Sequence, residues 1–156
     1  MNLYDSGTKL SIEKIKQYES EVGFSFPQDY TDFLLQNNGG IPEEDVIFDF
    51  IDASNDKHNS TDIREFFVFY EGEDTSYDDI MKVNRIMHEE ELLPEGLFVF
   101  CDDSGGNPVC MSLREDDYGC IYFCDHELED ADNGYLLMSY VAGSFGEFIS
   151  KLRIME

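Results

Sequence analysis

The chain has 156 residues, of which 42% are hydrophobic and 14% aromatic, which is enough apolar material for one domain with its own core. Its 10 basic and 35 acidic residues give a formal net charge of −25. This charge argues against nucleic acid and anionic membranes as partners, because both bind basic surfaces, and it favours a basic protein partner.

The first forty residues show the spacing of two helices. Ser11 is a typical N-cap, apolar residues follow it at helical spacing, and Gly23 is a natural stop, which predicts a helix over residues 11–22. Pro27 suits the first turn of a second helix. We expect this helix over residues 27–38, where two asparagines and two glycines end it.

The pattern then becomes that of strands. Alternating apolar residues and aromatic, β-branched composition predict strands over residues 46–52 and 65–70, with a polar loop at 55–60 between them. Helical spacing returns over residues 77–91, where apolar residues form one stripe.

The C-terminal half is rich in short strands. We expect strands in four apolar segments, at residues 97–101, 108–113, 119–124 and 135–141. Turn-forming residues separate these segments, at positions 102–107, 114–118 and 125–134. A last helix is expected over residues 144–153, with Ser144 as its N-cap.

These elements predict one α+β domain over residues 1–156. Short connections join antiparallel neighbours, so we expect a central, mostly antiparallel β-sheet, flanked by the N-terminal helices and a C-terminal helix. The sequence does not indicate an oligomeric state.

The N-terminus and the cysteines favour a cytoplasmic protein. Residues 1–7 lack the charged and apolar regions of a secretory signal, and no apolar run is long enough to span a bilayer. Cys120, Cys124 and His126 raise zinc as an alternative, but their C-x3-C-x-H spacing fits no common zinc motif. We expect no metal, and free thiols at all four cysteines, at positions 101, 110, 120 and 124.

The negative charge is concentrated in the middle of the chain. Residues 43–132 hold 27 acidic and five basic residues. One interpretation is that this charge only keeps the protein soluble, and the other is that it forms a negative face for a cationic protein. For the second interpretation the candidate partner-binding residues lie mainly in the loops, at Asp102, Asp103, Asp116, Asp117, Asp125, Glu127, Glu129 and Asp130.

No motif for catalysis stands out. Carboxylates are so numerous that a chance pair is not a sign of acid–base chemistry, and nucleophile-elbow, Walker, dinucleotide-binding and zinc-protease motifs are absent from the sequence. Residues 102–107 resemble the start of a calcium loop, but Leu113 stands at the twelfth position, where a glutamate is required. We therefore expect no enzyme, no catalytic residue and no cofactor, with an acidic hydrolase or a metal-dependent enzyme as the remaining alternative.

Four segments, taken in order, resemble the SUKH superfamily. Residues 23–40 resemble its helix with the pattern G-x-x-L-P-x-D-Y-x-x-F-L…N-G-G. Residues 100–110 resemble its G-x-D-x-x-G-N-x-I-C hairpin, residues 122–127 its V-Y-x-W-D-H-E strand, and residues 144–149 its closing S-F-x-E-F-L helix. Cys124 departs from the pattern, because an aromatic residue is common there.

The superfamily contains bacterial immunity proteins of polymorphic toxin systems and fungal regulators of cell-wall synthesis. The resemblance implies a protein that acts by binding other proteins. It points to a cytoplasmic immunity protein that binds and neutralises a cognate, basic, nuclease-type toxin. The alternative is a non-catalytic regulatory or scaffold module, as in the fungal branch.

Overall fold

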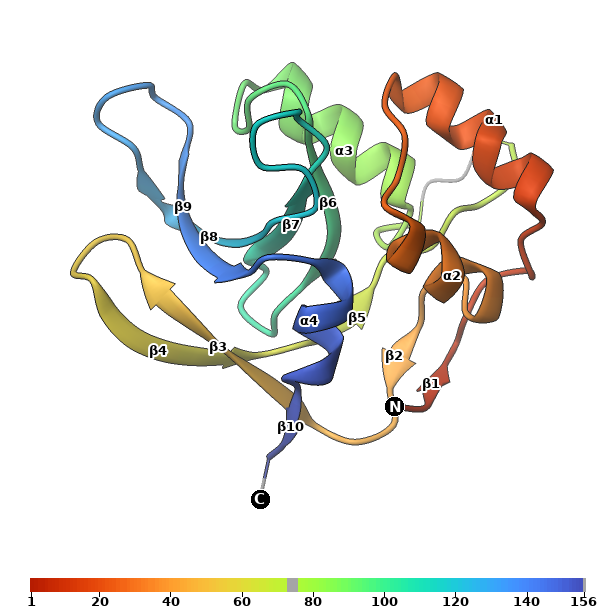
Figure 1. Cartoon of the computed structure of the whole chain (residues 1–156), viewed down its shortest axis with the longest axis horizontal. Helices are drawn as coiled ribbons and strands as arrows, with labels where there is room; N and C mark the ends of the chain where they lie inside the picture. Colours follow the sequence, from red (N-terminus) through yellow and green to blue (C-terminus); the bar gives the residue numbers. More distant parts are fainter. Residues whose placement is uncertain (73–75, 156) are drawn as a thin grey trace.

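In the computed structural model, which describes residues 1–72 and 76–155, eight strands form an antiparallel sheet that curls into a half-barrel (Figure 1). The strand order is β10-β3-β9-β8-β7-β6-β5, and β4 pairs with β3 outside this path. The strands of the sheet are β3 (Val46–Asp52), β4 (Lys57–Asp62), β5 (Glu65–Phe66), β6 (Leu97–Asp102), β7 (Pro108–Ser112), β8 (Ile121–Glu129), β9 (Leu136–Ala142) and β10 (Arg153–Ile154). A separate ribbon pairs β1 (Leu3–Tyr4) with β2 (Ile41–Pro42).

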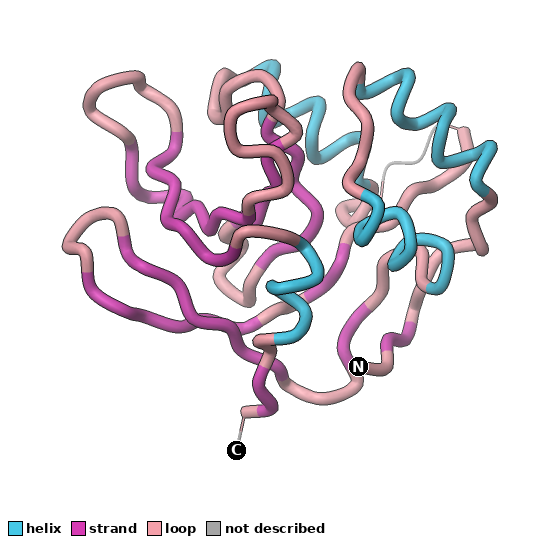
Figure 2. Tube along the Cα trace, viewed as in Figure 1, coloured by secondary structure: helices cyan, strands magenta, loops and turns pink. Residues whose placement is uncertain are grey.

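Four helices accompany the sheet in the described part of the chain: α1 (Ile12–Val22), α2 (Gln28–Gln36), α3 (Ile80–Glu89) and α4 (Phe145–Ser150). Figure 2 shows α1 and α2 together on one side of the molecule, whereas the β3–β4 and β8–β9 hairpins extend on the other. The predicted α+β class, the antiparallel sheet and the flanking helices at both ends of the chain are confirmed.

The helix ends follow the local signals in the sequence. The Ser11 side chain accepts a hydrogen bond from the Lys14 N–H (3.2 Å), and Gly23 ends α1 with a φ of 88°. The Ser144 side chain caps α4 by accepting from the Glu147 N–H (3.0 Å). Helix α3 begins three residues later than predicted, because the Asp79 carboxylate caps it at that point.

The core is largely aromatic and holds α2 and α4 against the sheet. The ring of Tyr30 on α2 lies 5.1 Å from that of Phe145 on α4, which lies 5.5 Å from Phe100 on β6. Phe148, the second core aromatic of α4, lies 5.2 Å from Phe48 on β3. All five side chains are at most 2% exposed, so their burial stabilises the packing of helices on sheet by about 1.5–3 kcal/mol each.

Helix α3 covers a free edge of the sheet. Strand β5 reaches β6 at its C-terminal end, so no strand of the described residues pairs with the same edge of β6 at Leu97 and Val99. The Asn84 amide on α3 fills this place by accepting from the Val99 N–H (2.7 Å) and donating to the Val99 carbonyl (2.9 Å). His88 Nε2 donates to the Leu97 carbonyl (2.8 Å). Two side chains of α3 therefore replace a strand and block edge pairing.

The predicted polar loop at residues 55–60 is wrong over most of its length. Residues 57–60 belong to β4, which pairs with β3 at six positions. The side chains of these residues are exposed, so the strand shows no apolar alternation. Its formation depends on the backbone of β3, a tertiary partner that local sequence does not reveal.

The strand predicted over residues 65–70 is shorter than expected. Strand β5 ends at Phe66, and the Asn38 amide then pairs with the backbone of Phe69, accepting from its N–H (2.9 Å) and donating to its carbonyl (2.8 Å). Next to it, Gly39 has a φ of 69°, and a Cβ there would lie 2.5 Å from the Phe67 carbonyl oxygen. The Asn-Gly-Gly sequence thus allows the end of α2 to approach the chain after β5.

Candidate protein-binding surface

The structure gives the eight candidate residues different roles. Asp102 and Asp103 are 5% and 3% exposed, at the end of β6 and in the following turn. Asp102 forms an ion pair with Arg64. Asp103 accepts hydrogen bonds from the backbone N–H groups of Gly105 (3.0 Å) and Asn107 (2.8 Å) and from the Thr61 hydroxyl (2.7 Å). The structure therefore places both carboxylates inside the molecule, where Asp103 holds the β6–β7 turn and Asp102 holds Arg64, the residue before β5.

Asp117 holds the loop between β7 and β8. Its carboxylate accepts from the Arg114 guanidinium, the Ser112 hydroxyl and the Tyr122 hydroxyl, the last at 2.7 Å. Partial burial raises the pKa of Asp117, but these hydrogen bonds and the positive charge of Arg114 outweigh it and lower the pKa to about 2. Asp117 stays charged at neutral pH and organises the loop on which Asp116 is exposed.

Strand β8 continues through three of the candidates. The sequence-based prediction placed residues 125–134 in a loop, but β8 extends to Glu129 and only the residues after it form the turn. Glu127 and Glu129 are exposed, whereas Asp125 and Asp130 are partly buried and bond to the backbone N–H groups two residues further on. Local sequence does not distinguish the two, because polar, turn-forming residues also fit an exposed strand end.

A segment that the sequence analysis did not select lies among these loops. The connection between α3 and β6 bonds to the end of β7, through the Leu113 N–H and the Gly96 carbonyl (2.7 Å). It also bonds to the start of β9, through the Leu136 N–H and the Leu92 carbonyl (2.9 Å). The end of α3 and this connection contribute four exposed glutamates, Glu89, Glu90, Glu91 and Glu95.

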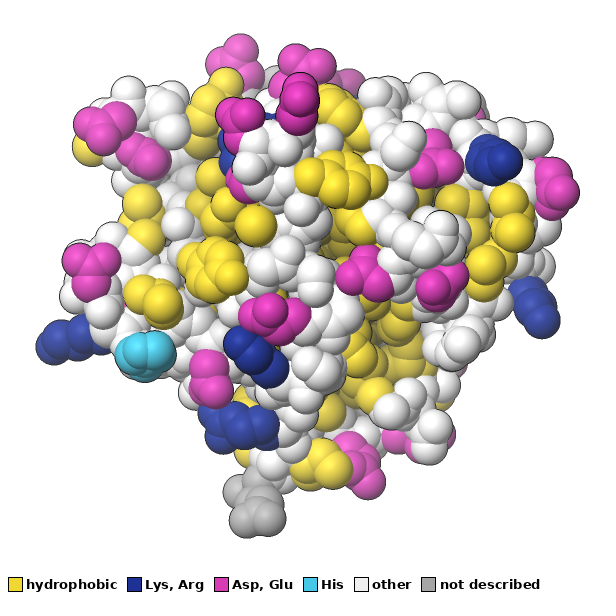
Figure 3. All heavy atoms as spheres, viewed as in Figure 1, with side chains coloured by type: hydrophobic (Ala, Val, Ile, Leu, Met, Phe, Trp, Pro, Cys, Tyr) yellow, Lys and Arg dark blue, Asp and Glu magenta, His cyan; other side chains and the backbone are white. Residues whose placement is uncertain are grey.

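These segments together form what we call the acidic edge, consisting of Glu89, Glu90, Glu91, Glu95, Glu115, Asp116, Glu129, Asp130 and Asp132. Among the described residues, none of these nine carboxylates takes part in an ion pair. Figure 3 shows acidic side chains over the β7–β8 and β8–β9 loops, whereas several basic side chains lie around α4, β4 and β10. In the sequence, the run of three glutamates at the end of α3 indicates an acidic surface. Only the fold shows that this run lies beside the β7–β8 and β8–β9 loops.

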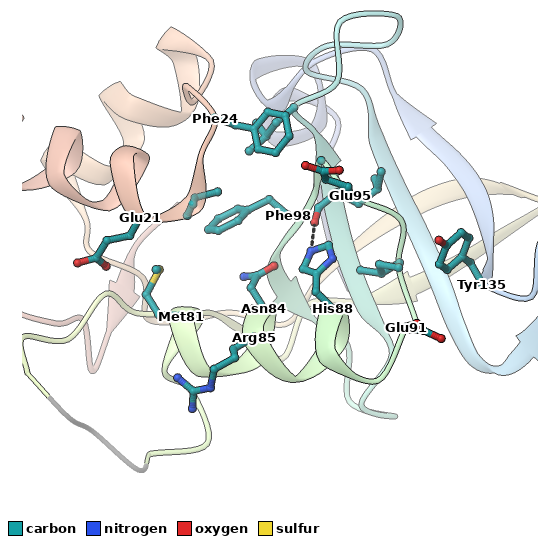
Figure 4. Close-up of a pocket in the computed structure, with 15 residues that line it drawn as sticks. Glu21, Phe24, Met81, Asn84, Arg85, His88, Glu91, Glu95, Phe98 and Tyr135 are labelled. Carbon is teal, nitrogen blue, oxygen red and sulfur yellow. Dashed lines mark hydrogen bonds between the residues drawn. The ribbon is translucent and has the colours of Figure 1, made fainter.

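A cavity of about 540 Å³ lies beside the acidic edge, between the end of α1 and α3 (Figure 4). Its floor is apolar and includes Leu93 and Phe98, both 2% exposed, with partly buried Phe24 and Met81 at the sides. The cavity shares Glu91 and Glu95 with the acidic edge. An apolar floor beside free carboxylates suits a ligand that is both apolar and cationic.

Cys124 and His126, two of the three residues considered for zinc, contact different neighbours. The Cys124 Sγ atom is buried, 4.0 Å from the Sγ of Cys110, and the exposed His126 donates its backbone N–H to Asn107 (2.9 Å). All four cysteines are free thiols. Within residues 1–72 and 76–155, no three His, Cys, Asp or Glu side chains come together as metal ligands. None of the helices described there is long and apolar enough to cross a membrane.

An antiparallel half-barrel with helices at both ends of the chain, and with the Asn-Gly-Gly and hairpin motifs at its turns, is the architecture of a SUKH-type domain. The chain belongs to the SMI1 / KNR4 family (SUKH-1), which it matches over residues 9–151. Members of this family are generally non-catalytic immunity or regulatory proteins. The chain is also similar to an uncharacterized protein of Bacillus subtilis (strain 168), the SPbeta prophage-derived YokK. The two are 30% identical over 162 residues, which cover 95% of this chain and 79% of the relative.

Proposed function

We propose that the protein is a cytoplasmic immunity protein that binds a cognate, basic, nuclease-type toxin and blocks its active site. The acidic edge is the observation that carries this proposal. Three separate segments bring nine carboxylates together with no ion pair among the described residues, in a chain of net charge −25. Free carboxylates on rigidly held loops attract a cationic surface and reject acidic partners.

The proposed mechanism is occlusion and needs no catalysis, metal or cofactor in this protein. A nuclease must present cationic groups to the phosphates of its substrate. The acidic edge offers carboxylates to the same groups and so competes directly with nucleic acid. Family membership supports the proposal, because the SUKH family includes immunity proteins. Of the candidate residues, Asp116, Asp125, Glu127, Glu129 and Asp130 remain proposed contacts, whereas Asp102, Asp103 and Asp117 are proposed to act by shaping the loops.

Protection of cells against the toxin tests the proposal. The protein is co-produced with a nuclease-type toxin domain selected from the genes that neighbour its own, and survival is compared with that of cells that produce a charge-neutralised variant. The variant Glu115→Gln/Asp116→Asn/Glu129→Gln/Asp130→Asn removes four charges from the acidic edge. A matched control, Glu43→Gln/Glu44→Gln/Asp45→Asn/Asp56→Asn, removes four exposed charges elsewhere.

The parent and the control are expected to protect, whereas the edge variant protects less and binds the inactivated toxin more weakly. Equal protection by all three proteins would show that the acidic edge serves only solubility. If the parent gives no protection and instead co-purifies with signalling or cell-wall enzymes, the regulatory or scaffold function is the correct one.

A further inference from the structure

The acidic edge accounts for fast and selective association with the proposed basic partner. Charge at an exposed rim, however, contributes little to the dissociation rate of a complex. Long-lived interfaces depend on a few apolar or aromatic anchors in desolvated pockets. The cavity between α1 and α3 lies where such an anchor is needed, because it adjoins the acidic edge at Glu95.

The wall of the cavity is rigid and already formed. The Phe98 ring in its floor is held by three other rings, those of Phe26 (5.1 Å), Tyr30 (6.4 Å) and Phe69 (6.3 Å). On the α3 side, the Asn84 amide makes three hydrogen bonds to the Val99 backbone and the Ile80 carbonyl, so it is not available to a ligand. A ligand would therefore enter without reordering the wall, which lowers the entropic cost of binding.

The margin of the cavity is anionic. Figure 4 shows Glu95 beside Phe24 and Glu21 at the α1 margin, whereas Arg85 and Glu91 point away from the cavity. Neither Glu21 nor Glu95 forms an ion pair with a described residue. A Lys or Arg of the ligand would find a free carboxylate on either side, with its aliphatic stem against the Phe24 ring.

We infer that this cavity is the anchor site for a short segment of the basic partner, which inserts one large apolar side chain and places adjacent Lys or Arg residues against Glu21 and Glu95. This inference rests on the proposed function, because it names the part of the same partner that the protein grips. A volume of about 540 Å³ is in the range of sites that hold a ligand of several side chains. A second copy of this chain is not the expected ligand, because each chain carries a net charge of −25 and the anionic margin would repel it.

Binding to the inactivated toxin domain is the first arm of the test. Met81→Trp fills the cavity from α3, and Glu21→Lys/Glu95→Lys reverses the charge of its margin. The control Glu43→Lys/Glu44→Lys makes the same change in net charge at two exposed positions away from the cavity. Both cavity variants are expected to raise Kd at least tenfold, mainly through faster dissociation, while their Tm stays close to that of the parent. If both bind within twofold of the control, the cavity is not the anchor site, although the proposed function stands.

The second arm does not need the toxin. The peptide Ac-Arg-Phe-Arg-NH2 is titrated into the isotope-labelled protein, and Ac-Glu-Phe-Glu-NH2 serves as the charge control. The peptide concentration is raised to about 10 mM, so that binding with a Kd as weak as about 1 mM is detected. The basic peptide is expected to shift the amide resonances of Phe24, Asn84 and Phe98 in the parent and not in Met81→Trp. No shift at the cavity, or equal shifts with the acidic peptide, would overturn the inference. If the parent does not bind the toxin, the proposed function fails, and this peptide arm alone then decides whether the cavity is a site for cationic, apolar ligands.

Discussion

Glu65 on β5 is an ionisable residue in a buried position. It is 2% exposed, and its Oε1 atom has no hydrogen-bond partner among the described residues. Burial, with the negative charges of Asp102 on β6 and of Asp78, raises its pKa to about 7, although the Arg64 guanidinium lies 3.4 Å away. The Glu65 carboxyl group therefore keeps its proton between about pH 4.5 and 7, where an exposed glutamate is charged.

The pH dependence of stability follows from this raised pKa. Between about pH 4.5 and 7 the folded state keeps the proton of Glu65 and the unfolded state loses it, so the free energy of unfolding falls as the pH rises through this window. At about 1.4 kcal/mol per pKa unit, the loss is about 3 kcal/mol. Urea unfolding of the parent and of Glu65→Gln at pH 4 to 8 measures it, because glutamine does not titrate. The variant is expected to gain stability relative to the parent only as the pH rises, and a constant difference would contradict the assignment.

Asp117 shows the opposite behaviour, since its partners favour the charged form. We expect Asp117→Asn to lower the free energy of unfolding by about 1–3 kcal/mol at neutral pH, because Arg114 and Ser112 lose a charged acceptor. The neighbouring Asp116→Asn, at an exposed position, is expected to change it by less than about 0.5 kcal/mol. Equal unfolding midpoints for the two variants would show that the loop does not depend on Asp117.

At the scale of elements, α4 illustrates a helix that depends on packing. Six residues are too few for an isolated helix, and its stability comes from the Ser144 cap and from two buried aromatic residues. One of these, Phe148, is 1% exposed and lies 5.2 Å from Phe48 and 5.7 Å from Phe100, so it joins α4 to both β3 and β6.

Removing this ring is expected to leave a cavity under α4. Phe148→Ala should lower the free energy of unfolding by about 3–5 kcal/mol. Lys151→Ala, at the exposed end of the same helix, is expected to cost no more than about 0.5 kcal/mol, because an exposed ion pair with Glu147 contributes little. Thermal or denaturant melts compare the two, and similar values would mean that α4 does not depend on Phe148.

At the scale of the whole molecule, the charge distribution predicts how binding responds to salt. The Debye length falls from about 10 Å at 0.1 M to about 3 Å at 1 M ionic strength, so attraction to the acidic edge is screened. The association rate with the proposed basic toxin is expected to fall steeply over this range, whereas the dissociation rate changes less, because close contacts are screened poorly. Stopped-flow measurements test both rates, and an association rate independent of salt would leave the charge without a part in recognition.

The sequence by itself determined those features whose causes are local. Ser11, Gly23 and Ser144 place helix ends because caps act within a few residues, and the short apolar segments joined by turns indicate an antiparallel sheet. The four motifs indicated the family, which the match over residues 9–151 confirms. The net charge is the sum over the residues, so the sequence alone supplies it, and it is the basis for proposing a basic partner.

Only the tertiary structure decided the features that depend on distant neighbours. Strand β4 exists because β3 pairs with it, and the Asn38 amide, which follows α2, takes over the pairing after β5. Asp102 and Asp116 are both acidic loop candidates in the sequence, yet the first is buried against Arg64 and the second is exposed. The acidic edge and the cavity beside it need α3, β7 and β9 to meet, and hydrogen bonds between residues far apart in the chain bring them together. The local pattern of a sequence carries no record of such contacts, because burial and pairing arise only when the chain has folded.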